Sequence, residues 1–62
     1  MDIREIRAFT GLSQAKFGEK YEIPKITIEQ WESGKRKPPA YVVNMLEFIV
    51  LNNLDYNYNK HK

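Results

Sequence analysis

Apolar side chains lie three or four residues apart over most of the chain, which is the spacing of amphipathic helices. The first predicted helix is indicated by the helical spacing of Ile3, Ile6 and Thr10. Gly11 follows as the residue that ends it. A second, short helix is predicted over about residues 13–21, where Ser13 can act as the N-cap and Phe17 and Tyr21 share one face. No segment has the pattern of a strand.

Prolines mark the starts of two further predicted helices. Pro24 blocks continuation of the second helix and favours a new start, so a third helix is predicted over about residues 25–33 and ends at Gly34. A longer apolar helix follows a Pro-Pro pair and covers about residues 39–52. The pattern therefore predicts an all-α fold of four helices.

Length and composition limit this fold to one small domain. With 62 residues and no cysteine, neither a disulfide nor a Cys-based zinc site can stabilise it. The domain is predicted over residues 1–54, and the polar, Asn-rich residues 55–62 predict a flexible tail. The longest apolar stretch, residues 42–51, is too short to span a bilayer of about 30 Å, and no signal peptide is visible. We therefore expect a soluble, cytoplasmic protein.

The residue types disfavour an enzyme. A catalytic pocket needs a cavity of a few hundred Å³ walled by several elements, which is much for so short a chain. The only histidine is His61 in the predicted tail, and the chain has no Cys nucleophile and no Gly-rich phosphate loop. We expect no catalytic residue, no metal and no cofactor.

The formal net charge is only +2, but the basic residues are unevenly placed. Residues 1–31 carry equal numbers of acidic and basic side chains, so the surplus comes from residues 35–37 and the tail. By itself, a Lys-Arg-Lys run is as often a solvated loop as a binding site. Its surroundings must decide between these alternatives.

Three short motifs in register resemble the phage-repressor-like (Cro/Xre) helix-turn-helix family, over about residues 3–50. They are Leu-Ser-Gln at residues 12–14, Ile-Pro-Lys-Ile-Thr-Ile at residues 23–28, and Trp-Glu-Ser-Gly-Lys-Arg-Lys-Pro-Pro at residues 31–39. The resemblance implies a compact four-helix, lambda-repressor-like domain, here without a clear fifth helix. It also implies a small prokaryotic or phage regulator that binds double-stranded DNA.

The helical wheel of residues 25–33 agrees with that resemblance. Ile28 and Trp31 fall on one side with Glu32, and the opposite side is mostly polar, with no packing role. The alternative is that this polar side is merely solvated. The resemblance implies that the helix lies in the major groove and contacts base edges through four residues: Lys25, Ile26, Glu29 and Gln30.

The resemblance also implies contacts with the DNA backbone on both sides of that helix. Gln14 matches the family's phosphate-binding glutamine, at a helix N-terminus that favours an anion. The other expected phosphate contacts are Thr27, Ser33, Lys35, Arg36 and Lys37.

Two further positions match a structural feature of the family. Arg7 and Glu32 are expected to form a partly buried ion pair that joins the first helix to the end of the third, the alternative being two separate surface charges. The chain departs from the family at Glu22, where glycine is usual, so we expect a strained left-handed residue. It also departs at Gly18, usually alanine, where we expect the third helix to cross closely.

The fourth predicted helix carries more apolar residues than one core contact requires. Val42, Met45, Leu46 and Ile49 form one stripe, and further apolar residues broaden it. The candidate partner surface consists of Tyr41, Phe48, Leu51 and Leu54. We expect this surface to form a two-fold homodimer or to bind another protein. The sequence thus leaves two functions open: a sequence-specific DNA-binding regulator, and a protein-interaction module such as an antitoxin or adaptor.

Overall fold

The computed structural model describes residues 1–54, and these residues contain four α-helices and no strand. The helices are α1 (Ile3–Thr10), α2 (Gln14–Tyr21), α3 (Lys25–Ser33) and α4 (Ala40–Asn52). The predicted all-α fold is confirmed. Helix α2 begins directly after Ser13, the predicted N-cap, and α4 begins at Ala40 with Pro39 as its N-cap. The predicted tail, residues 55–62, lies outside the described residues.

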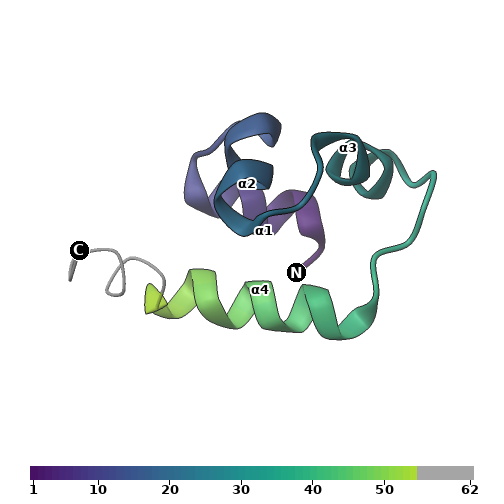
Figure 1. Ribbon diagram of the computed structural model, residues 1–62. Coiled ribbons are helices and arrows are strands. Elements are labelled where there is room, and N and C mark those ends of the chain that lie inside the picture. The colour runs from purple at the N-terminus through teal and green to yellow at the C-terminus, as the bar shows by residue number, and fades with distance from the viewer. Residues whose placement is uncertain (55–62) are drawn as a thin grey trace.

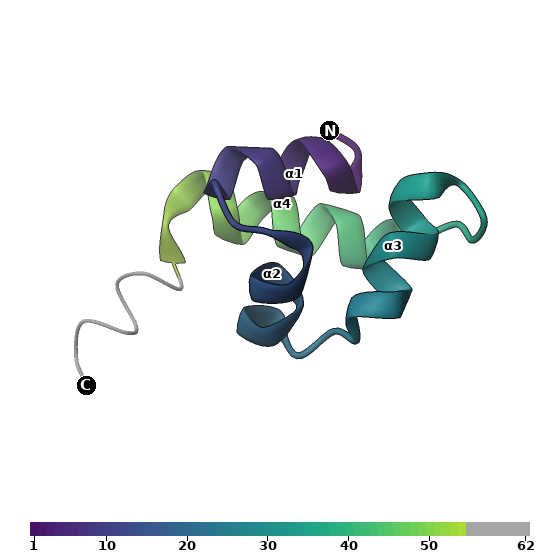
Figure 2. The same ribbon diagram turned by 90° about the horizontal axis from the view of Figure 1, so that it is seen from above.

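The three short helices form a layer on one side of α4, which runs along the lower edge of the molecule in Figure 1. Figure 2 shows α1 lying along α4, with α2 and α3 arranged beside them. Helix α1 contacts both α3 and α4, and α2 contacts α3. The order helix, tight turn, helix in α2 and α3 is that of a helix-turn-helix unit.

A single apolar core holds the helices together. Its buried side chains come from every helix: Ile3, Ile6, Phe17, Ile28, Leu46 and Val50. Ile6, Phe17 and Ile28 are fully buried, and they come from α1, α2 and α3 respectively. Since burial of such a side chain stabilises a fold by about 1.5–3 kcal/mol, each short helix depends on this core for its stability.

Local hydrogen bonds explain where the first two helices begin. The Glu5 N–H donates to Asp2 Oδ1 and the Asp2 N–H donates to Glu5 Oε1, each over 2.9 Å, which forms a capping box at α1. At α2, Ser13 Oγ accepts the Lys16 N–H over 3.1 Å. Helix α1 ends at Gly11, whose φ of 76° is the left-handed conformation that glycine adopts without strain.

Both departures from the family pattern lie near the turn between α2 and α3: Gly18 inside α2 and Glu22 at its C-cap. Glu22 has a φ of 59°, so the expected left-handed residue is confirmed. A Cβ added to Gly18 would lie 2.4 Å from the Ile23 carbonyl oxygen and 3.1 Å from Cδ1 of Ile28. The expected close approach of α3 to Gly18 exists through Ile28. The atom nearest to the added Cβ, however, is the Ile23 carbonyl oxygen, which belongs to the turn rather than to α3. The turn folds back on α2 because the Ile23 N–H donates to the Gly18 carbonyl over 2.8 Å.

None of the helices found in residues 1–54 combines the length and the apolar character that crossing a bilayer requires.

Candidate nucleic-acid interface

Helix α3 is attached to the domain by one side only. Ile28 is fully buried, and the Glu32 side chain is only 2% exposed. On the opposite side, Ile26 is 58% exposed and Gln30 is half-buried. Lys25, at the border between the two sides, is exposed, and Glu29 is half-buried. Of the predicted base-contacting residues, Ile26 and Gln30 therefore lie on the side of α3 away from the core.

The end of α3 fixes the position of the basic loop. Gly34 ends the helix with a φ of 85°. The Gln30 carbonyl then accepts the Ser33 hydroxyl over 3.2 Å and the Arg36 N–H over 3.1 Å. The loop backbone is thus hydrogen-bonded to the last turn of α3, which keeps the basic side chains beside that helix.

The basic loop itself has free charges. Lys35, Arg36 and Lys37 are all exposed, and none of them forms an ion pair with another residue in the described part of the chain. Their charges are therefore available to an anionic ligand. Thr27, also expected to contact phosphate, is half-buried near the start of α3.

Two of the expected base-contacting residues interact with each other. Lys25 Nζ lies 3.4 Å from Glu29 Oε2, one helical turn away, and both side chains are partly exposed. An exposed pair at this spacing contributes about 0.3–0.5 kcal/mol, so it can open at little cost when a ligand approaches. Glu29 therefore reduces the positive charge that Lys25 presents to solvent.

A carboxylate at the end of α3 connects three elements. Arg7 donates to Glu32 twice, with Nε 2.6 Å from Oε2 and Nη2 3.0 Å from Oε1, so the two residues form a bidentate ion pair. Arg7 Nη1 also donates to the Leu12 carbonyl over 2.9 Å. The hydrogen bonds from Arg7 lower the pKa of Glu32 below its ordinary value of 4.5, against the effect of burial.

Gln14 and Arg4 also reach this carboxylate, which sequence reasoning missed. Gln14 Nε2 donates to Glu32 Oε1 over 3.1 Å, and Arg4 Nε lies 3.6 Å from the same oxygen. The spacing of Arg4 and Arg7, three residues apart on one helix, was a signal for the second contact. An amide nitrogen carries two N–H donors, so Gln14 can bind Glu32 and still donate to an external anion.

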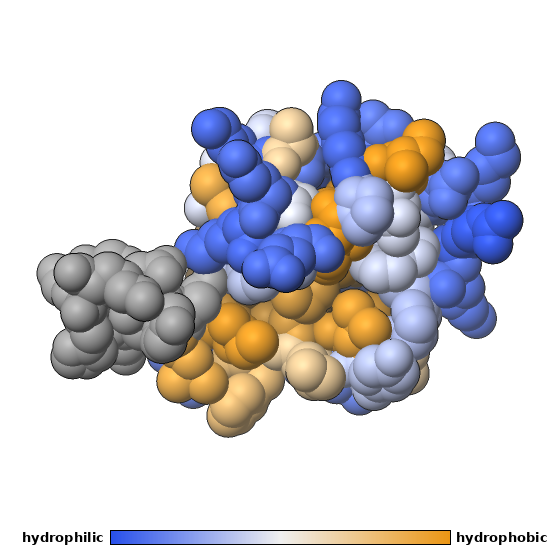
Figure 3. All heavy atoms as spheres, in the orientation of Figure 1, coloured by the Kyte–Doolittle hydropathy of each residue, from blue (hydrophilic) through white to orange (hydrophobic). Residues whose placement is uncertain are grey.

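The apolar surface of α4 lies away from the core. The predicted partner surface is exposed: Tyr41 67%, Phe48 61%, Leu51 43% and Leu54 44%. Met45 is 58% exposed and belongs to the same surface. The sequence pattern had placed it in one stripe with Leu46, which is buried. Met45 lies four residues after Tyr41 and three before Phe48, and this helical spacing could have assigned Met45 to the exposed surface. Figure 3 shows hydrophobic atoms gathered along α4 at the lower edge of the molecule.

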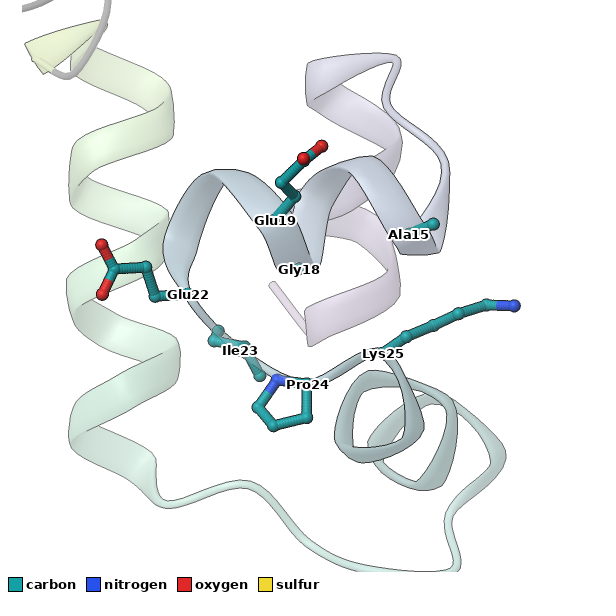
Figure 4. A pocket seen from close by; sticks show the side chains of 7 residues that line it. All are labelled: Ala15, Gly18, Glu19, Glu22, Ile23, Pro24 and Lys25. Atoms are coloured by element: carbon teal, nitrogen blue, oxygen red, sulfur yellow. The ribbon is translucent and has the colours of Figure 1, made fainter.

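A shallow hollow of about 550 Å³ lies between α2 and the start of α3. Figure 4 shows Gly18 on the side of α2 near the turn, Glu19 and Glu22 pointing in different directions, and Lys25 extending away. These ionisable groups do not converge on one point, so the hollow has no arrangement for acid–base catalysis. Residues 1–54 also hold no group of three or more His, Cys, Asp or Glu that could bind a metal ion.

Comparison with protein-family models, with curated proteins and with solved structures finds no match for this chain.

Proposed function

We propose that this chain is a sequence-specific DNA-binding module, a small prokaryotic or phage transcriptional regulator of the Cro/Xre type. One observation carries the proposal. Within residues 1–54, Ile28 and Glu32 hold α3 to the domain by one side, the outer side faces solvent, and three exposed basic residues without an ion pair follow beside its last turn. A single exposed helix of this kind fits the width of the major groove.

The outer residues of α3 would then contact base edges. Gln30 can form paired hydrogen bonds with adenine, Lys25 can donate to guanine, and Ile26 offers an apolar surface to the thymine methyl group. Glu29 can accept from cytosine N4 once its pair with Lys25 opens.

The residues around α3 would contact the phosphates. Lys35, Arg36 and Lys37 would supply contacts that do not depend on sequence, with Ser33 and Thr27 beside them. Gln14 would donate its second amide hydrogen from the start of α2. Because the formal net charge is only +2, non-specific affinity should be modest, and useful binding needs base contacts or a second copy.

The test is selection of bound sequences from a randomised duplex pool, repeated at two salt concentrations. The proposal expects one short motif to be enriched at both concentrations. Binding that falls steeply with salt and enriches no sequence would contradict base reading and leave electrostatic attachment alone.

Two substitutions separate base contacts from phosphate contacts and act as controls for each other. Gln30→Ala should relax the preference at one base pair, at a cost of about 1–3 kcal/mol for the preferred sequence. Lys37→Ala should weaken binding to all sequences alike. It should also reduce the slope of log binding constant against log salt concentration by about one. If Gln30→Ala left the selected motif unchanged, the proposed orientation of α3 would be wrong.

A protein-interaction role, such as that of an antitoxin or adaptor, is the second candidate. The exposed apolar residues of α4 favour it, because monomeric proteins rarely expose a large contiguous apolar patch. No binding of duplex DNA at either salt concentration would favour this role over DNA binding.

A further inference from the structure

The first turns of α3 carry a hydrogen-bond donor, an acceptor and an apolar group close together. These are the Lys25 ammonium, the Glu29 carboxylate and the Ile26 side chain. The Lys25 and Glu29 side chains are 57% and 41% exposed, and Ile26 is 58% exposed. All three groups are therefore accessible to a ligand that approaches α3 from outside the domain.

The three side chains have a fixed order around the helix. With 3.6 residues per turn, Glu29 lies about 40° around the helix from Lys25, and Ile26 lies about 100° from Lys25 in the same direction. Glu29 therefore lies between the other two. A helical side chain leans toward the N-terminus of its helix, which brings Glu29 back to the level of Lys25. The distance of 3.4 Å between Glu29 Oε2 and Lys25 Nζ agrees with this.

The major-groove edge of a C·G base pair presents matching groups in the same order. Guanine O6 is an acceptor, cytosine N4 is a donor, and the C5 position of cytosine comes next. O6 and N4 are hydrogen-bonded to each other and lie about 2.9 Å apart, which is close to the 3.4 Å between Lys25 Nζ and Glu29 Oε2. Because this exposed ion pair opens at little cost, Lys25 can donate to O6 while Glu29 accepts from N4.

We propose that Lys25, Glu29 and Ile26 together read one base pair, 5-methylcytosine paired with guanine, an inference that rests on the proposed DNA-binding function. A helix lying along the major groove spans the groove with its circumference, so the order around α3 becomes the order across the base pair. Ile26 then contacts the methyl group at C5. Thymine carries the same methyl group but has the acceptor O4 in place of N4, so Glu29 would face another acceptor.

Each of the two preferences has an expected size. Burial of one methyl group against Ile26 corresponds to a change of about fourfold in the binding constant. Thymine in place of 5-methylcytosine loses a base-specific contact, which corresponds to at least about fivefold. The site should therefore bind 5-methylcytosine more tightly than either unmodified cytosine or thymine.

Selection with the full chain from two randomised duplex pools tests the proposal. One pool contains cytosine, and the other contains 5-methylcytosine throughout. We expect both selected motifs to contain a C·G pair. Duplexes of the motif then carry 5-methylcytosine, cytosine or thymine at each C·G position in turn, with the opposite base changed to match. At one position, cytosine should raise the Kd about fourfold and thymine at least about fivefold relative to 5-methylcytosine.

Two variants separate the methyl contact from the contact with N4. Ile26→Ala should remove the preference for the methyl group and keep the preference for cytosine over thymine. Glu29→Gln should keep the methyl preference and reduce the preference over thymine, because an amide can donate as well as accept. Phe9→Ala is the control for the loss of an exposed apolar side chain, because Phe9 is 63% exposed and lies on α1. This control should keep both preferences.

Several results would overturn the proposal and leave DNA binding in place. They are a selected motif without a C·G pair, equal Kd values for cytosine and 5-methylcytosine at every position, thymine bound as tightly as 5-methylcytosine, and a methyl preference that survives Ile26→Ala. If neither pool yields a bound duplex, DNA binding itself is contradicted, and with it the reading of 5-methylcytosine.

Discussion

The bidentate pair between Arg7 and Glu32 should contribute a large part of the stability of this small domain. The substitution Glu32→Ala removes the acceptor of both Arg7 bonds and of the Gln14 bond. It also leaves the Arg7 guanidinium, whose side chain is 22% exposed, without its partner. We expect the free energy of unfolding to fall, mainly because that charge stays partly buried and unpaired.

The size of the effect follows from the burial of the two partners. Removing one partner of a fully buried pair costs about 3–5 kcal/mol, and partial hydration of Arg7 reduces this to about 2–4 kcal/mol. A domain of this size has a total stability of roughly 3–9 kcal/mol. Glu32→Ala should therefore lower the Tm by at least about 8 °C, since 1 kcal/mol corresponds to about 4–8 °C in a small domain.

The assay is thermal unfolding followed by circular dichroism and by the fluorescence of Trp31, the only tryptophan. Glu29→Ala is the matched control, because it removes a glutamate from the same helix whose pair with Lys25 is exposed. The control should change stability by less than about 0.5 kcal/mol. A Glu32→Ala protein that melts within about 2 °C of this control would refute the reasoning.

Three further predictions concern pH and the turn between α2 and α3. Because the pKa of Glu32 is lowered from 4.5 in the folded state, the stability that its ionisation supplies is present above about pH 4.5 and is lost as the pH falls through the lowered value. Glu32→Gln should lack this part of the acid dependence in denaturation curves. Gly18→Ala should destabilise the fold by about 1–2 kcal/mol despite the better helix propensity of alanine, because its Cβ would meet the Ile23 carbonyl oxygen at 2.4 Å. Glu22→Gly should stabilise the fold by up to about 1 kcal/mol, because glycine relieves the strain of a φ of 59°, as the urea midpoint would show.

Each of these predictions has a result that contradicts it. The difference in stability between wild type and Glu32→Gln should shrink toward pH 3, and a constant difference would exclude the pKa as its cause. A higher Tm for Gly18→Ala would mean that the turn moves aside freely. Glu19→Gly, the same change in the interior of α2, should destabilise by about 1 kcal/mol, so an equal loss for Glu22→Gly would mean that its left-handed conformation stores no strain.

The helix ends were predictable because they depend on residues close in sequence. Ser13 caps α2 through the N–H of Lys16, three residues later, and Gly34 ends α3 with its own backbone conformation. These helix ends require no knowledge of the remaining chain. The left-handed conformation of Glu22 was expected on a different ground, the resemblance, because glycine is usual at this position of the family's turn.

The nature of the closest contact in the turn required the structure. The sequence indicated that a small residue is needed at Gly18, but assigned the contact to α3. The nearest atom is the Ile23 carbonyl oxygen, because the turn folds back on α2 through the hydrogen bond from Ile23 to Gly18. A residue pattern reports the size of a side chain, but it does not report which backbone atom lies against it.

The sequence by itself determined four helices, the caps of α2 and α3, and an outer face of α3 without a packing role, because helical periodicity and capping are local properties. The tertiary structure alone decided that Gln14 and Arg4 share the Glu32 carboxylate with Arg7. It also decided that Met45 faces solvent while Leu46, the next residue, is buried. On a helix that is apolar around most of its circumference, hydropathy does not distinguish the two sides, and the side that α1 covers becomes the core.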